Sequence, residues 1–277
     1  RSELALTGWF RPANWDAAGV NGLEVNDLDL GGSGPLLIPG TNRLIGGGKQ
    51  GVMYVLDPAM KNAGGAACVP SLAQTCMASE ALQSFQVAPT PPRPNEYFRH
   101  ILGGPVVWAR KSGGARLFVW RQNDYLRSYA LADTVANCSK DNAAPDTSHN
   151  CPSLAQSAEF IDSRHPGGIL TISANADDAA SALVWASTNA SNTGPAKLLA
   201  YEAMPSDTEP GLLKKLWDSD ACAEDQIPLG VDFAPPTVAN GKVYVATGLN
   251  RVDVFGLMAN KTCSPTPPQP NLGPLLQ

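Results

Sequence analysis

The sequence predicts an all-β fold built from repeated antiparallel sheets, and two observations support this. One pattern recurs four times, at residues 34–87, 103–162, 167–218 and 234–257: an apolar strand after Gly or Pro, a tight turn, then further short strands. Gly (26) and Pro (24) are abundant, as a fold with many turns requires. Stacked copies of such a unit are typical of a β-propeller. We therefore predict a β-propeller with four blades of four strands. Whether these blades are part of a larger propeller stays open.

Each unit divides into strands at its turn residues, because runs of alternating or continuous apolar residues end at Gly, Asn, Asp or Ser. The strands nearest the predicted axis come first in each unit. The expected strands are 36–39, 43–47, 51–56 and 82–87 in the first unit; 105–109, 116–120, 125–131 and 158–162 in the second; 169–173, 182–187, 197–203 and 214–218 in the third; and 236–239, 242–247 and 251–256 in the fourth.

The fourth unit has no fourth strand of its own. The Pro-rich tail at 259–277 cannot supply ladder hydrogen bonds, so the propeller domain is expected to span residues 1–258. The apolar run ELALTGWF at 3–10 has no unit of its own. We expect it to complete the last blade, which would remove an open sheet edge. The alternative is a longer propeller, in which 3–10 completes a different blade.

Composition supports a packed core and excludes two kinds of partner. Hydrophobic residues make up 43% of the chain, and Trp108, Trp120 and Trp185 are expected between sheets. A net charge of -5 without a basic stripe argues against nucleic acid. No apolar run reaches the roughly 18 residues of a membrane span. The partner is then an unidentified ligand or protein.

Six cysteines form three sequence-local candidate pairs: Cys68 with Cys76, Cys138 with Cys151, and Cys222 with Cys263. Short loops closed by disulfides indicate an oxidising compartment, so we expect a secreted or periplasmic protein. Free thiols or metal ligands are the alternative, although no CxxC motif occurs.

Two Arg-His pairs occupy matched places before the first strands of neighbouring units. Arg99 and His100 precede one Gly-Gly, and Arg164 and His165 precede the next. Loops that enter the first strands gather at one mouth of the channel, so these side chains are candidates for a ligand site. The alternative is that a repeated unit simply repeats its turn residues.

Asp27 and Asp29 form a carboxylate cluster in a turn, and Asp177 with Asp178 forms another. Such clusters can bind Ca²⁺ with backbone carbonyls, or they can cap turns. GxSxG, HExxH and P-loop motifs are absent, and no catalytic residue is identified.

Residues 26–258 resemble the pyrroloquinoline-quinone (PQQ) repeat propellers of the quinoprotein alcohol dehydrogenase superfamily, most closely its secreted members of unsettled role. The motifs that carry the resemblance are NDLDLGGSGPLLIP (26–39), GGGKQGVMYVLD (46–57), LFVWRQNDYLRSYAL (117–131), GGILTISAN (167–175) and FAPPTVANGKVYVAT (233–247).

The resemblance implies PQQ and calcium as cofactors and an oxidoreductase that acts on alcohols or sugars. It also implies a parent with more blades, with an N-terminal part as a further partner. The chain departs from the family in having no adjacent cysteine pair. From the residues themselves we predict a secreted binding module with its ligand at the channel mouth, and the oxidoreductase is the alternative.

Overall fold

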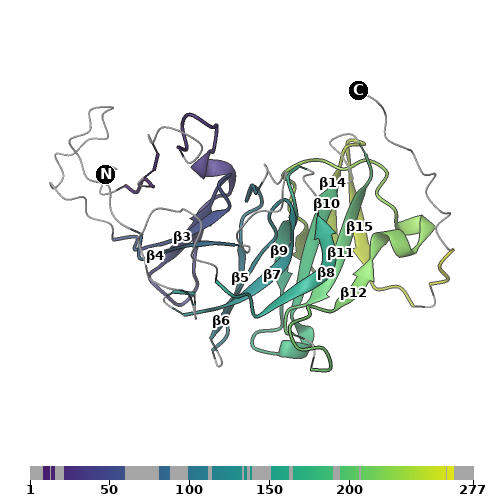
Figure 1. The fold of residues 1–277 in the computed structure, drawn as a ribbon. Helices are drawn as coiled ribbons and strands as arrows, with labels where there is room; N and C mark the ends of the chain where they lie inside the picture. Colours follow the sequence, from purple (N-terminus) through teal and green to yellow (C-terminus); the bar gives the residue numbers. More distant parts are fainter. Residues whose placement is uncertain are drawn as a thin grey trace, which may run out of the picture.

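The protein is an array of four antiparallel sheets that follow one another in chain order (Figure 1). The computed structural model describes residues 9–12, 14–15, 22–59, 81–87, 99–111, 114–132, 134–135, 138, 151–161, 165–189, 194–205, 207–259 and 261–264. The first sheet contains β1 (Leu36–Leu37), β2 (Leu44–Gly47), β3 (Val52–Leu56) and β4 (Gln83–Gln86). The second contains β5 (Val106–Trp108), β6 (Ala115–Val119), β7 (Asp124–Leu131) and β8 (Ala155–Ile161), and the third contains β9 (Ile169–Ser173), β10 (Leu183–Asn189), β11 (Ala196–Glu202) and β12 (Lys215–Asp218). The last contains β13 (Thr237–Ala239), β14 (Lys242–Thr247) and β15 (Arg251–Gly256).

Every strand expected within the four units is present, and in each sheet the strands pair in chain order. The largest shift is at β8, which begins at Ala155 instead of residue 158. Ala155 pairs with Ser128 beyond an irregularity in the β7 register, so the ladder continues where the sequence indicated a loop. Short 3-10 turns, η1 (Leu30–Gly32), η3 (Ala179–Ser181), η4 (Ser219–Ala221) and η5 (Ala223–Asp225), complete the described elements.

The core consists of three apolar layers, each between two neighbouring sheets. Phe85 and Tyr129 pack edge to face between the first two sheets, with ring centroids 5.6 Å apart. Trp120 and Tyr201 do the same between the second and third sheets at 5.9 Å. Val243 and Val245 of the last sheet pack on Leu198 of the third. The sheets therefore stack face to face, as the blades of a propeller do.

The three tryptophans lie where the sequence placed them. Trp108 and Trp120 are buried in the layer between the second and third sheets, and Trp185 packs partly buried against the last layer. Between the described residues no apolar layer joins the last sheet to the first, and the two lie at opposite ends of the array (Figure 1). The all-β, repeated-sheet prediction is confirmed, and a closed propeller stays a prediction.

The described end of the N-terminal run does not lie on the last sheet, where the sequence indicated it. Phe10 packs its ring on Tyr54 of β3, with centroids 5.1 Å apart. Tyr54 and Val52 lie on the face of the first sheet that points away from the second, and both are buried. Phe10 therefore covers the first sheet and not the last. Pairing of residues 3–8 lies outside the described residues.

The last sheet has three described strands and an exposed outer face. Val252 and Val254 of β15 are 58% and 52% exposed. The register places them opposite Ala246 and Tyr244, on the side away from the third sheet. The prediction of a fourth strand here is therefore unsupported by the described residues.

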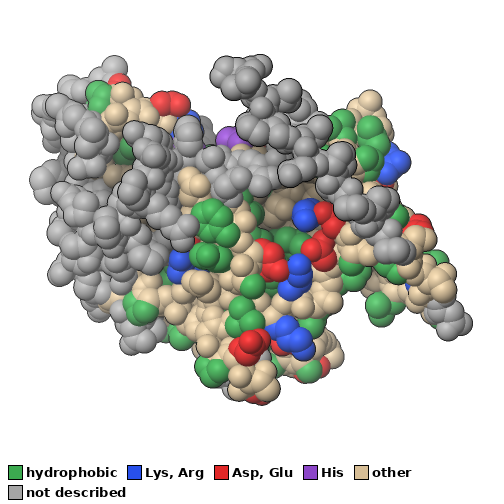
Figure 2. Space-filling model, turned by 45° about the vertical axis from the view of Figure 1, so that its right-hand side comes forward, with side chains coloured by type: hydrophobic (Ala, Val, Ile, Leu, Met, Phe, Trp, Pro, Cys, Tyr) green, Lys and Arg blue, Asp and Glu red, His purple; other side chains and the backbone are tan. Residues whose placement is uncertain are grey.

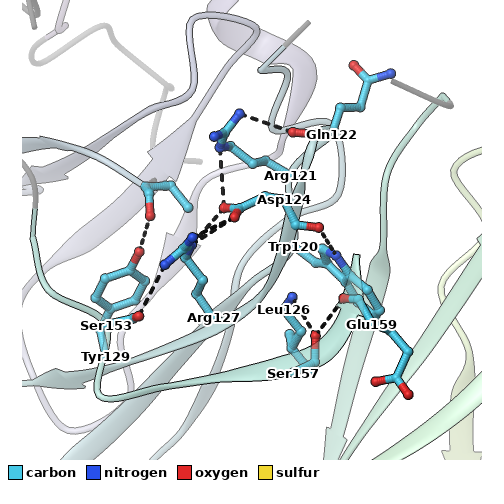
Figure 3. A network of polar contacts seen from close by, with 11 residues as sticks. Trp120, Arg121, Gln122, Asp124, Leu126, Arg127, Tyr129, Ser153, Ser157 and Glu159 are labelled. Atoms are coloured by element: carbon cyan, nitrogen blue, oxygen red, sulfur yellow. Dashed lines mark hydrogen bonds and ion pairs between the residues drawn. The ribbon is translucent and has the colours of Figure 1, made fainter. Parts of the chain in front are cut away.

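A buried ionic network lies at the start of β7, on the side that faces the first sheet (Figure 3). The Asp124 carboxylate accepts hydrogen bonds from the Arg127 guanidinium, at 2.7 Å from Nη2 and 2.8 Å from Nε. Arg121 Nε lies 3.4 Å from the same carboxylate. Asp124 is only 2% exposed and Arg121 4%. One buried carboxylate therefore compensates two guanidinium groups.

Two of the three expected disulfides are present. Cys138 pairs with Cys151 and Cys222 with Cys263, with Cα atoms 4.8 Å and 5.2 Å apart. The Cys222–Cys263 disulfide joins the segment after β15 to the turn between η4 and η5. Cys68 and Cys76 lie outside the described residues. The described part of the chain contains no helix that is long and apolar enough to cross a membrane.

Candidate ligand site at the mouth of the sheets

The loops that enter each sheet meet at one end of the array, where each is tied to the preceding sheet. Ile101 N donates to Gly48 O at 3.1 Å, and Gln122 N donates to His100 O at 3.0 Å. Gly168 N donates to Trp120 O at 3.2 Å. The first strands β5, β9 and β13 also lie beside one another. These contacts place neighbouring entry loops next to one another, and we call this end of the array the mouth.

Glycine is required where two entry loops approach each other. A Cβ on Gly103 would lie 2.5 Å from Gly168 O, and a Cβ on Gly168 would lie 2.8 Å from the Trp120 ring. Only a residue without a side chain allows this spacing. The repeated Gly-Gly pairs in the sequence therefore set the distance between neighbouring entry loops.

Asp27 and Asp29 meet at a lysine. Lys49 Nζ lies 2.8 Å from a carboxylate oxygen of each. The hydrogen bonds to Asp27 and Asp29 raise the pKa of Lys49, and the hydrogen bond and charge of Lys49 lower the pKa of Asp27. An ammonium group thus occupies the place between the carboxylates that a calcium ion would need. Calcium at Asp27 and Asp29 stays a prediction, and the ion would have to displace Lys49.

The second acidic pair caps turns. Asp178 Oδ1 accepts a hydrogen bond from Ala180 N at 3.0 Å, and Asp177 Oδ1 accepts one from Lys111 N at 2.9 Å. Among the described residues, the one cluster of three metal-ligating side chains is Cys222, Glu224 and Cys263. Its two sulfur atoms form a disulfide, so they are not thiolate ligands.

His100 lies at the mouth in a surrounding that opposes its protonation. Burial is the main cause, followed by the positive charges of Lys49 and His165, and together they lower the pKa of His100 to about 4. Asp27 and Asp29 act in the opposite direction but do not outweigh these effects. His100 is therefore neutral near neutral pH, and its imidazole can donate and accept hydrogen bonds.

This pKa predicts an acid-sensitive stability. An unfolded histidine titrates near 6.5, so between about pH 6.5 and 4 the unfolded chain binds a proton that folded His100 does not. The free energy of unfolding should fall as the pH drops through this window, and His100→Gln should remove that part of the fall. Urea unfolding of both proteins at about pH 7 and about pH 5 measures it. Equal losses in the two proteins would contradict the assignment.

His165 is paired with an acid from the next entry loop. Its Nδ1 lies 3.6 Å from Asp232 Oδ2, and Asn189 Nδ2 donates to Asp232 Oδ1 at 2.7 Å. The His165 ring also packs edge-on against Phe233, with centroids 5.1 Å apart. Asn189 and Phe233 therefore hold the acid and the imidazole in place from two sides.

An apolar pocket of about 280 Å³ opens beside this pair. Phe233 lines it, together with Ile169 and Leu170 from β9 and with residues 102–106 at the start of β5. Phe233 is 52% exposed and has a φ of 60°, a conformation that is costly for a bulky residue. Strain of this kind persists where the surrounding structure holds it, and it is frequent at binding sites.

The charge of His165 contributes to the lowered pKa of His100, and a ligand site at the Arg-His pairs stays a prediction. Arg99 lies in the same loop, with its backbone against Gly51. Arg164 lies outside the described residues. Sequence reasoning missed Lys49, Asp232 and Phe233. Asp232 and Phe233 precede β13 by the same spacing as Arg164 and His165 precede β9, so a closer alignment of the third and fourth units could have found them.

The chain matches no known protein-family model, and no curated protein sequence matches it significantly.

Proposed function

We propose that the protein is an exported binding module that holds a small uncharged ligand, an apolar group carrying a hydroxyl, in the pocket at the mouth of its sheets. Two disulfides support export, because such bonds persist in oxidising compartments. The observation that carries the proposal is Phe233, a half-exposed aromatic ring in a left-handed conformation over an apolar pocket.

The pocket supplies two kinds of contact. Phe233, Ile169 and Leu170 offer apolar surface for a ring or a short chain. His165 is outside the pocket lining but its ring contacts Phe233, and the Asp232 carboxylate beside its Nδ1 favours the tautomer with the proton on that nitrogen. Nε2 is then an acceptor for a hydroxyl proton. A carboxylate ligand would meet the negative charge of Asp232, so an alcohol fits better than an acid.

Benzyl alcohol is a suitable probe, and its binding can be measured by isothermal titration calorimetry. We expect saturable binding that weakens about tenfold in Phe233→Ala, because the ring supplies much of the apolar contact. The control Leu249→Ala, which shortens an apolar side chain that is 45% exposed in another turn, should bind as the parent does. Benzoate should bind more weakly than the alcohol. No saturable binding, or equal binding by Phe233→Ala, would contradict the proposal.

The family resemblance supports a test of the quinoprotein alternative. PQQ binding in that family involves calcium and an adjacent-cysteine disulfide, whereas here Lys49 occupies the carboxylate pair and no adjacent cysteines exist. We expect that incubation with PQQ and Ca²⁺ produces no dye-linked oxidation of benzyl alcohol or glucose. Dye reduction that requires PQQ, Ca²⁺ and one of these substrates would contradict this and favour the oxidoreductase.

A further inference from the structure

A second pocket, of about 270 Å³, lies between the second and third sheets. Phe160, which is 40% exposed, and Ile161 contribute apolar surface next to the buried Trp120 and Leu199, while Glu159, Lys197, Lys215 and Asp218 contribute charged groups. None of the four charged residues lines the mouth pocket, although Trp120 and Asn189 of this second pocket contact residues of the mouth. We propose that this pocket binds a neutral sugar ring, in addition to the ligand of the mouth.

The charged groups of the pocket are already paired, either with one another or, for Lys197, with Asp220 outside the pocket lining. Lys215 Nζ lies 2.9 Å from Glu159 Oε1 and 3.0 Å from Asp218 Oδ2, and Lys197 Nζ lies 2.7 Å from Asp220 Oδ2. Two lysines and two acids line the pocket, so their formal charges cancel. Figure 2 likewise shows acidic and basic side chains intermixed on one face of the molecule. An ionic ligand would have to displace one of these partners.

A hydroxyl group needs no such displacement. The Lys215 ammonium has three hydrogens, of which the contacts to Glu159 and Asp218 use two. Each carboxylate oxygen has a second lone pair. The pocket thus retains both a donor and acceptors, and a sugar hydroxyl can accept from the first and donate to the others.

The polar groups are also held in position before any ligand arrives. Tyr201 Oη donates to Glu159 Oε2 at 2.9 Å, and burial raises the pKa of Tyr201, so its hydroxyl remains a donor. The carboxylates of Glu159 and Asp218 raise the pKa of Lys215 despite its partial burial, so it stays charged. The Glu159 carboxylate points away from the Arg121–Asp124–Arg127 network (Figure 3). Fixed donors and acceptors reduce the ordering cost of binding.

The apolar side of the pocket completes the match. Phe160 of β8 lines the pocket, is 40% exposed, and is held by an edge-on contact with Tyr125, with ring centroids 5.3 Å apart. Trp120 and Leu199 also line the pocket but are nearly fully buried. A pyranose has C–H groups on its faces and hydroxyls around its edge. Apolar surface and a mixed rim of donors and acceptors together suit such a ring better than a purely apolar or purely ionic molecule.

Titration calorimetry with D-glucose, D-galactose and D-mannose tests the proposal. We expect at least one of the three to bind saturably, with a dissociation constant of roughly millimolar size. Glu159→Gln and Lys215→Met should each weaken that binding about tenfold, because each removes a charged hydrogen-bond partner. Gluconate and glucosamine should bind less well than the neutral sugar.

Lys214→Met is the matched control, since Lys214 is the neighbouring residue, 58% exposed, and pairs with Glu202 instead. It should leave sugar binding unchanged, and circular dichroism should show that all variants are folded. Phe233→Ala should also leave it unchanged, so failure here is distinguishable from failure of the mouth site. The proposal is wrong if none of the three sugars binds saturably up to about 100 mM, or if Glu159→Gln and Lys215→Met bind as the parent does.

Discussion

Asp124→Asn should destabilise the protein by about 3 to 5 kcal/mol, the range expected when one partner of a buried ionic group is lost. The substitution keeps the shape of the side chain but removes its charge. Arg121 and Arg127 would then be two buried cations without their shared carboxylate. The free energy of unfolding from urea titration measures the loss.

Two further variants separate this charge effect from a change in packing. In Arg121→Met/Asp124→Asn one of the cations is absent, so the double variant should lose less than the sum of the single variants. Asp253→Asn is the matched control, because Asp253 pairs with Arg251, whose side chain is 52% exposed. Loss of an exposed pair should cost about 0 to 1 kcal/mol. If Asp124→Asn costs no more than Asp253→Asn, the network does not stabilise the fold.

Gly103→Ala should be the most damaging of the small substitutions at the mouth. Its Cβ would lie 2.5 Å from Gly168 O and 2.9 Å from Ile169 Cδ1, so the two entry loops would have to separate. Overpacking of this kind costs about 1 to 3 kcal/mol. Because Gly103 and Ile169 also line the apolar pocket, binding of benzyl alcohol should weaken as well.

The adjacent residue is a direct control. A Cβ on Gly104 would meet no atom within 4 Å, and its backbone is not left-handed. Gly104→Ala should therefore unfold at the same temperature as the parent or slightly higher, since it reduces the freedom of the unfolded chain. Thermal melts that show equal stability for the two variants would mean that the close approach of the loops is not required.

The strands were predictable because their signals are local. Apolar runs ended by Gly or Asn define β14 and β15 to the residue, and the same signals place β9. The contacts between units were less accessible. Ion pairs between loops depend on how loops from different sheets meet, and the spacing of residues in the sequence does not specify this. Examples are the pairs of Lys49 with Asp27 and Asp29, and of His165 with Asp232.

The destination of the N-terminal run shows the same limit. Its apolar pattern indicated a strand that completes the last blade, whereas Phe10 packs on Tyr54 of the first sheet. The pattern cannot distinguish which sheet, because the outer faces at both ends of the array are apolar. Tyr54 receives Phe10, whereas Val252 and Val254 remain exposed. The apolar composition of residues 3–10 indicates that they pack on a sheet, but the three-dimensional path of the chain determines which sheet they cover.

Backbone amide chemical-shift mapping with benzyl alcohol tests the binding site most directly. The account predicts saturable shifts at Gly103, Gly104, Ile169, Leu170 and Phe233, which line one pocket although they come from two entry loops and strand β9. Shifts that are absent, or that lie only at residues remote from this pocket, would contradict the claim that the mouth of the sheets is where the protein binds its ligand.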